Sequence, residues 1–253
     1  EKGKIIETNW DWHKDEVRQV ARMLGLDEEI ASRQPFPGPG LGVRILCNDS
    51  TVAITTEQRE KLADFLAAYE GWKYVGKIAP IRSVGVQGDN RSYKSLVVLG
   101  GGLPTDWDAL FEVARAIPNN LSFINRVAYR VDSKEPVSTL TCTPMHICHE
   151  TAEVLREADA IVTGTVMNKK IAQCFAVLLP VSTDETSARP YSIVIRAVVT
   201  SDYMTARAAV PGVHFPVEAL ESAAKQIKQK LGDKVDMVLY DVTGKPPATI
   251  EWE

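Results

Sequence analysis

A run of alternating proline and glycine between Arg33 and Arg44 constrains this chain more than any other stretch of its sequence. Pro35, Pro37 and Pro39 fix the backbone φ angle and lack an amide hydrogen, so neither a helix nor a central strand can continue through them. The glycines between the prolines allow another chain or a ligand to approach closely. The run is therefore predicted to be a stiff connector between two folded units. A connector that also lines a ligand site is the alternative.

Composition and charge narrow the class of protein. A chain of 253 residues can form one large domain or two modest ones, and its 45% hydrophobic content is that of a globular protein. A net charge of −4 argues against a protein that binds nucleic acid by neutralising phosphates. No apolar run reaches the roughly 18–20 residues that cross a bilayer, so no membrane partner is expected. Four cysteines without paired spacing indicate reduced thiols and a cytoplasmic protein.

Beyond the Pro/Gly run, the sequence predicts the same order of elements twice. Periodicity and apolar runs identify in turn a helix, two strands, a helix and a strand. In the first half these are residues 55–68, 77–87, 92–101, 105–117 and 124–131. In the second half they are residues 150–163, 173–181, 190–200, 216–231 and 236–242. Pro80, Tyr93, Leu110 and Tyr129 correspond to Pro180, Tyr191, Leu220 and Tyr240, which indicates a degenerate duplication.

The predicted fold class is α+β. Each copy is expected to form a two-layer sandwich, in which a pair of helices covers an antiparallel sheet. A helix over residues 12–24 is expected before the linker, and Gly42–Cys47 is predicted to be a strand after it. Thr55 and Gln58 have the spacing of a capping box at the start of the next helix. Open sheet edges favour pairing of each copy with its twin or with another chain.

Four motifs, taken in this order, resemble glutamine-hydrolysing GMP synthase. They are His13–Arg18, Arg33–Arg44, Val84–Tyr93 and Gly244–Glu253. The resemblance implies that residues 1–34 end an ATP-pyrophosphatase domain and that residues 35–46 are the linker. Residues 47–132 and 150–253 would then be two repeats of a dimerisation domain, joined by residues 133–149, as in the longer, eukaryotic-type form. Because the chain starts at Glu1 without Met, we expect it to be a piece of a longer protein.

The resemblance also implies which residues contact xanthosine monophosphate (XMP). These are Pro39, Gly40, Asp89, Arg91, Gln173, Lys245, Ile250 and Glu251. Lys245 would meet the phosphate, and Arg91 would reach the phosphate of the neighbouring subunit's nucleotide. Ammonium and guanidinium groups suit a phosphate, while the Glu251 carboxylate can accept hydrogen bonds from sugar hydroxyls or a ring N–H.

Each of these motifs also has a purely structural interpretation. Residues 88–91 have the chemistry of a hairpin turn, which glycine and asparagine alone would explain. Residues 245–253 could be a frayed terminus.

A zinc site is a separate possibility, because four cysteine and histidine residues lie close together in the sequence. Their spacing matches no usual zinc motif, so no metal site is predicted. These four residues are Cys142, His146, Cys148 and His149.

The predicted function is the XMP-binding and dimerisation part of GMP synthase. That family makes GMP from XMP, with ATP, magnesium and glutamine. The sequence contains neither a Ser-Gly-Gly-Val-Asp-Ser loop for ATP nor a Cys-His-Glu glutaminase arrangement, so we expect no catalytic residue and no bound cofactor in this chain. Its expected partners are XMP, a second copy in a homodimer, and the ATP-pyrophosphatase and glutaminase domains. The alternative is a non-catalytic stand-alone dimerisation or regulatory module.

Overall fold

The computed structural model describes residues 10–33, 41–69, 71–87, 90–184, 186, 188–200 and 205–252. The chain divides into two compact units, residues 1–35 and residues 36–253. In the first unit, α1 (Lys14–Met23) and α2 (Glu28–Ala31) are joined by Arg22, which donates to both carboxylate oxygens of Glu28 at 2.8 Å. The predicted helix over residues 12–24 is confirmed. Its apolar stripe is not buried, since Leu24 is 76% exposed.

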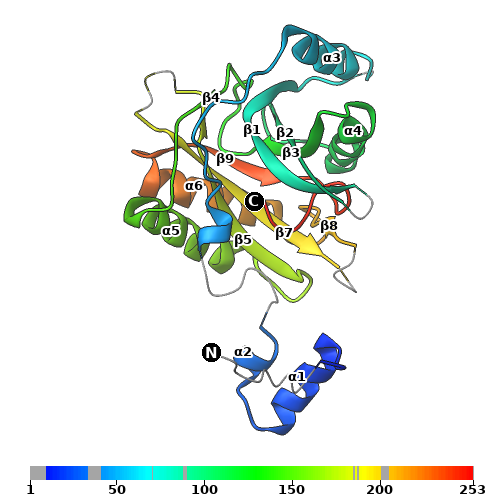
Figure 1. Ribbon diagram of the computed structural model, residues 1–253, viewed down its shortest axis with the longest axis vertical. Helices are drawn as coiled ribbons and strands as arrows, with labels where there is room; N and C mark the ends of the chain where they lie inside the picture. Colours follow the sequence, from blue (N-terminus) through cyan, green and yellow to red (C-terminus); the bar gives the residue numbers. More distant parts are fainter. Residues whose placement is uncertain are drawn as a thin grey trace, which may run out of the picture. The chain divides into compact units, whose positions relative to one another are not determined.

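The second unit is built on one seven-stranded sheet (Figure 1). Its strands, in spatial order, are β1 (Val75–Gln87), β2 (Asn90–Gly100), β3 (Ile124–Arg130), β9 (Val235–Asp241), β7 (Tyr191–Val199) and β5 (Gln173–Leu179). The short strand β8 (Arg207–Ala208) pairs with β7 beyond the end of β9. Both predicted repeats therefore lie in a single sheet, and the α+β class is confirmed.

All four long helices cover the same face of this sheet. They are α3 (Thr56–Ala67), α4 (Trp107–Asn120), α5 (His149–Val166) and α6 (Val217–Leu231). Their buried side chains form one apolar cluster with strand residues such as Tyr129 and Tyr240. The cluster on the opposite face contains no residue of these helices and is closed instead by Leu46, Val137, Leu140, Ile250 and Trp252. Connecting segments therefore take the place of a second helical layer.

Local sequence accounts for where the helices begin. The capping box of α3 is confirmed, because the Gln58 amide donates to Thr55 Oγ1 at 3.1 Å and the Thr55 amide donates to Gln58 Oε1 at 2.9 Å. Helix α4 is capped by Asp106, whose carboxylate accepts from the Ala109 amide at 3.0 Å. The helix predicted over residues 105–117 therefore has its cap one residue after the predicted start.

The strand directions correct one expectation. Within each repeat the first pair is antiparallel, but β2 runs parallel to β3 and β7 runs parallel to β9. A helix joins each parallel pair, because α4 and α6 carry the chain back before the next strand enters the sheet. The sheets are therefore mixed and not wholly antiparallel. The two repeats meet where β3 and β9 pair antiparallel, with Tyr129 opposite Tyr240.

A second correction concerns residues 42–47. The structure has the 3-10 helix η1 (Gly42–Arg44) where a strand was predicted, followed by a parallel bridge from Ile45 to Leu178 at the edge of β5. The turn directs Arg44 inward, where its guanidinium lies 2.6 Å from a carboxylate oxygen of Asp159. The observed turn thus goes together with an ion pair to a distant helix, which local strand propensity could not indicate.

The connection between the repeats also takes on structure. Residues 141–142 form β4 (Thr141–Cys142), which pairs antiparallel with β6 (Val181–Ser182).

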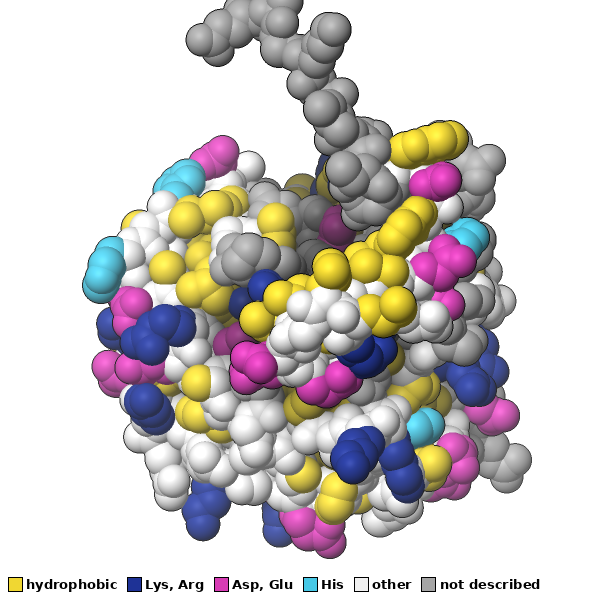
Figure 2. Space-filling view, turned by 90° about the horizontal axis from the view of Figure 1, so that it is seen from below, with side chains coloured by type: hydrophobic (Ala, Val, Ile, Leu, Met, Phe, Trp, Pro, Cys, Tyr) yellow, Lys and Arg dark blue, Asp and Glu magenta, His cyan; other side chains and the backbone are white. Residues whose placement is uncertain are grey.

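The surface carries both signs of charge. Figure 2 shows that described Lys and Arg side chains are interspersed with Asp and Glu over the face drawn there. No helix among the described residues combines the length and apolar character needed to cross a membrane.

Candidate functional site

The tail, defined here as residues 244–252, lies between the β1–β2 hairpin and β8. The amide of Val84 donates to Trp252 O at 3.0 Å, and the amide of Val86 donates to Pro247 O at 2.8 Å. On the other side, the Lys245 amide donates to Ala206 O at 2.7 Å. The tail is therefore hydrogen-bonded along both flanks and is not a frayed end. In Figure 1 it lies against the sheet.

Gly85 shows how closely the tail approaches the hairpin. It forms an isolated antiparallel bridge with Ala248, and a β-carbon built on it would lie 2.6 Å from Pro247 O and 2.8 Å from Asn125 Nδ2. Only a residue without a side chain allows the two backbones to come this near. The glycine of this motif therefore has a packing reason that lies outside the turn itself.

Beneath the tail lies a buried charge cluster formed by Arg126 of β3, Arg196 of β7 and Asp241 of β9. All three side chains are 0% exposed. Asp241 lies 2.7 Å from Arg126 Nη1 and 3.1 Å from Arg196 Nη1. Two guanidinium groups thus share one carboxylate, and further acceptors are needed because a buried charge without partners is costly.

The tail and the residue before it, Thr243, supply those acceptors. Arg126 Nη2 donates to the carbonyl oxygens of Glu251 at 2.7 Å and Thr249 at 3.3 Å, and Arg196 donates to those of Thr243 at 2.6 Å and Thr249 at 3.2 Å. Burial lowers the pKa of Arg126 to about 10, although Asp241 opposes the shift. The group therefore stays charged at neutral pH.

Trp252 closes the cluster from the tail side. Its ring lies 4.2 Å from the guanidinium carbon of Arg126, a distance at which a cation–π contact forms. With 1% of its surface exposed, it is one of the largest fully buried side chains in the described part of the chain. The tail is held both by charge and by aromatic packing.

Two of the predicted XMP ligands come together here. Arg91 at the start of β2 lies 3.7 Å from the carboxylate of Glu251, with 62% and 43% of the two side chains exposed. Lys245 is partly exposed on the same tail. Segments that are far apart in sequence thus bring one cation beside a carboxylate, and Lys245 lies on the same tail as that carboxylate. Their roles toward a nucleotide stay predictions.

The remaining predicted ligands fall into two groups. Gln173 is fully buried at the start of β5, opposite Val198 of β7, and Ile250 is 9% exposed in the apolar cluster on the tail side of the sheet. Pro39, Gly40 and Asp89 lie outside the described residues.

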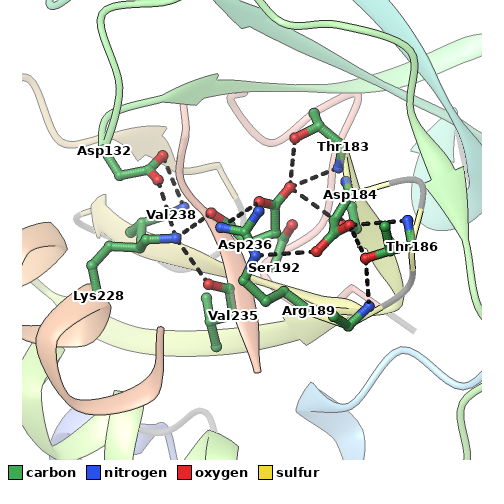
Figure 3. Close-up of polar contacts among 12 residues, drawn as sticks. Asp132, Thr183, Asp184, Thr186, Arg189, Ser192, Lys228, Val235, Asp236 and Val238 are labelled. Carbon is green, nitrogen blue, oxygen red and sulfur yellow. Dashed lines mark hydrogen bonds and ion pairs between the residues drawn. The ribbon is translucent and has the colours of Figure 1, made fainter. Parts of the chain in front are cut away.

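In the second repeat, Arg189 takes the place that Arg91 has in the first, and its contacts are different (Figure 3). Arg189 lies 3.1 Å from the carboxylate of Asp184 and 3.4 Å from that of Asp236. Although burial works against it, hydrogen bonds from Thr183 hold the pKa of Asp236 below its ordinary value. Lys228 of α6 donates to Asp236 O at 2.5 Å, so the network also joins the helix to β9. Arg189 is thus committed to internal ion pairs, whereas Arg91 is mostly exposed.

The possible metal ligands do not converge. Cys142 Sγ accepts a hydrogen bond from Asn48 at 3.1 Å, while Cys148 lies at the N-cap of α5. Over the described ranges, no three His, Cys, Asp or Glu side chains gather in a way that could hold a metal ion.

A cavity of about 820 Å³ lies elsewhere, between α3, β1 and residues 139–142. Its lining includes Ile54, Leu62 and Leu140, and none of the predicted XMP ligands. Its size is typical of ligand pockets, but it is apart from the charged groups of the tail. The charge arrangement, and not cavity size, is the better guide to the site.

Sequence reasoning missed Arg126, Arg196 and Asp241. A signal for them exists, since each is a charge within or at the end of a strand that is otherwise apolar, and fully buried charges are almost always paired. Their partners, however, lie on other strands that are distant in the sequence. Arg126 and Asp241 are 115 residues apart.

Comparison with known proteins shows which family the chain resembles. Residues 161–252 match the family model described as GMP synthase C terminal domain. A probable glutamine-hydrolysing GMP synthase of Caenorhabditis elegans is 33% identical, over 99% of this chain and 42% of the relative. Over nearly its whole length, the chain matches the C-terminal part of GMP synthases. The resemblance inferred from the four motifs is confirmed.

Two further relatives of GMP synthase type align equally far. A probable glutamine-hydrolysing GMP synthase of Leptospira interrogans is 38% identical over 100% of this chain, and a GMP synthase of Dictyostelium discoideum is 31% identical over 99% of it. The chain spans only 40–42% of the length of these relatives.

Proposed function

We propose that the chain is the XMP-binding and dimerisation part of a GMP synthase, in which the tail and the β1–β2 hairpin form the nucleotide site. The observation that supports this most directly is the meeting of Arg91 and Glu251, 3.7 Å apart, beside a tail that also carries Lys245. Partly exposed cations suit a phosphate, and a nearby carboxylate suits sugar hydroxyls or a ring N–H.

In this proposal the chain binds and orients XMP and does not carry out the chemistry. Conversion to GMP would use ATP, magnesium and glutamine, bound by ATP-pyrophosphatase and glutaminase domains. We expect no ATP-dependent amination of XMP by residues 1–253 alone, measured by AMP release with ammonia supplied. Turnover by the pure chain would contradict the proposal that other domains carry out the chemistry.

The described residues include all four cysteines, and no disulfide is present among them, which supports a reducing compartment such as the cytoplasm.

Calorimetric titration with XMP and with xanthosine tests the site. The two ligands differ only in the phosphate, so their affinity ratio measures phosphate recognition. Lys245→Ala or Arg91→Ala should reduce XMP affinity about ten- to a hundredfold, because each removes a charge-assisted contact, and should leave xanthosine almost unchanged. Lys77→Ala, at the opposite end of β1, is the matched control. Absence of XMP binding by the unaltered chain would favour the non-catalytic module instead.

Dimerisation and the direction of Arg91 can be tested together. If Arg91 reaches the partner's nucleotide, mixing the Arg91→Ala and Lys245→Ala proteins would restore one intact site per mixed dimer. With equal amounts and random exchange, about half of the dimers are mixed, so about a quarter of the binding capacity should return. If Arg91 acts only beside its own Glu251, mixing restores nothing. Sedimentation velocity on the same samples measures whether dimers form.

A further inference from the structure

We propose that Arg126 and Arg196 are positioning residues, which set the relative placement of the hairpin and the tail before any nucleotide binds. The identity of the ligand rests on the proposed function, whereas the contacts that hold the tail do not depend on it. The proposal therefore assigns a role to two side chains that are fully buried.

Arg126 controls the spacing between hairpin and tail. One nitrogen, Nη2, donates to Val84 O of β1 at 3.0 Å and to Glu251 O of the tail at 2.7 Å. A guanidinium is planar and its donors have fixed directions, so one group that contacts both backbones fixes the distance between them. Arg91 at the hairpin and the Glu251 side chain are thereby set with respect to each other.

Arg196 does the same for the start of the tail. It donates to Thr243 O at 2.6 Å and to Thr249 O at 3.2 Å, on either side of Lys245. Because β7 belongs to the second repeat and β3 to the first, each repeat contributes one arginine to the same tail. Neither repeat alone contains the complete support.

Asp241 determines which way both guanidiniums face. It pairs with one terminal nitrogen of each arginine, which leaves the other terminal nitrogens directed at the tail carbonyls. Hydrogen bonds that involve a charged group are stronger than neutral ones, and stronger still when desolvated. The tail is thus held from beneath by charge and does not need a ligand to order it.

Hydrogen exchange on the complete chain without nucleotide tests the proposal. The amides of Val84, Val86 and Ala248 report on the tail, because they donate to Trp252 O, Pro247 O and Gly244 O. We expect these amides to be protected in the unaltered chain. Exchange as fast as in an unstructured peptide would overturn the proposal, whatever the variants do.

The variants Arg126→Lys and Arg196→Lys keep the charge and can still pair with Asp241, but lose the forked geometry. Each should speed exchange of the reporter amides about tenfold and leave the amides of β5 unchanged. Each should also lower the XMP-to-xanthosine affinity ratio by a similar factor, which a general loss of stability would not do. The matched control is Arg130→Lys, on the same strand as Arg126, because the guanidinium of Arg130 pairs with Asp132 at 3.0 Å instead of with the tail.

Each outcome decides one question. Faster exchange at the reporters with a lower affinity ratio supports the positioning role. Unchanged exchange in both lysine variants, or equal acceleration in Arg130→Lys, overturns it. If the unaltered chain does not bind XMP, the proposed function fails, and the exchange data still decide whether the arginines hold the tail. If one lysine variant does not fold, the other variant and the unaltered chain suffice.

Discussion

Replacement of Asp241 by asparagine should destabilise the second unit more than any surface change of the same chemistry. The Asp241 carboxylate is 0% exposed and is the shared counter-charge of Arg126 and Arg196. Asp241→Asn conserves shape but removes the charge, which leaves two buried guanidinium groups without an anion. Breaking a buried ion pair by removing one partner costs about 3–5 kcal/mol.

The expected change in melting temperature follows from the size of the unit. For 150–250 residues, each 1 kcal/mol shifts the Tm by about 2–4 °C, so Asp241→Asn should lower it by roughly 6–20 °C. Circular dichroism melts at pH 7 measure this directly. Asp233→Asn, an exposed carboxylate between α6 and β9, is the matched control and should change the Tm by less than about 2 °C.

A second substitution tests whether uncompensated charge is the cause. Adding Arg126→Met to Asp241→Asn removes one of the two orphaned cations and should recover part of the lost stability. A Tm of Asp241→Asn within about 2 °C of the unaltered chain would refute the reasoning. So would a double variant that is less stable by the sum of both single effects.

Three further changes probe other parts of the structure. Gly85→Ala places a methyl group within 2.6 Å of Pro247 O, so we expect a loss of about 1–3 kcal/mol in urea unfolding, and no loss would mean that the tail moves away easily. A neighbouring backbone amide and hydroxyl lower the pKa of the exposed Cys148 thiol, whereas burial raises the pKa of Cys174. Cys148 should therefore react with a disulfide reagent at pH 7, and Cys174 only on unfolding. A fast phase of the reaction that survives Cys148→Ser would contradict this. The pKa of Asp236 in the folded protein lies below its ordinary value of 3.8. The stabilising contribution of Asp236 is therefore complete above pH 3.8 and is lost as the pH falls through the folded-state pKa. Asp236→Asn should flatten the decline of Tm in acid, and an unchanged slope would exclude this contribution.

The sequence alone predicted the elements of the second unit well, because apolar periodicity is a local signal. The predicted strand 236–242 is observed as Val235–Asp241, and the predicted helix 216–231 as Val217–Leu231. The correspondence of Tyr129 with Tyr240 is also meaningful in space, since the two face each other where the repeats join. Local pattern and repeat order were sufficient for this much.

Strand direction and sheet membership could not be predicted in the same way. A helix between two strands allows a parallel pair, but the apolar pattern of β3 is the same whichever neighbour it has. That β3 pairs with both β2 and β9 is decided by packing across the whole unit. The expectation that each sheet is wholly antiparallel failed for this reason, whereas the expected pairing of one copy with its twin is observed between β3 and β9.

The residues of the candidate site also fall into those that the sequence indicated and those that it did not. Arg91, Lys245 and Glu251 were assigned from their motifs, which a short stretch of sequence can carry. Arg126 and Arg196 were not, because a charged residue inside an apolar strand gives no sign of which distant carbonyl it will meet. Residues that belong to a local motif are easier to find from sequence than residues whose partners are distant.

The long separation between tail and hairpin has a consequence for how the protein forms. Arg126 and Glu251 are 125 residues apart in sequence, so their contact closes a very long loop and is expected to appear late in folding. While the chain is being synthesised, the first repeat can fold with the outer edge of β1 at Val84 and Val86 unpaired, and such an edge invites association with other strands. The later arrival of residues 244–252 would then complete the sheet edge and the candidate site in one step.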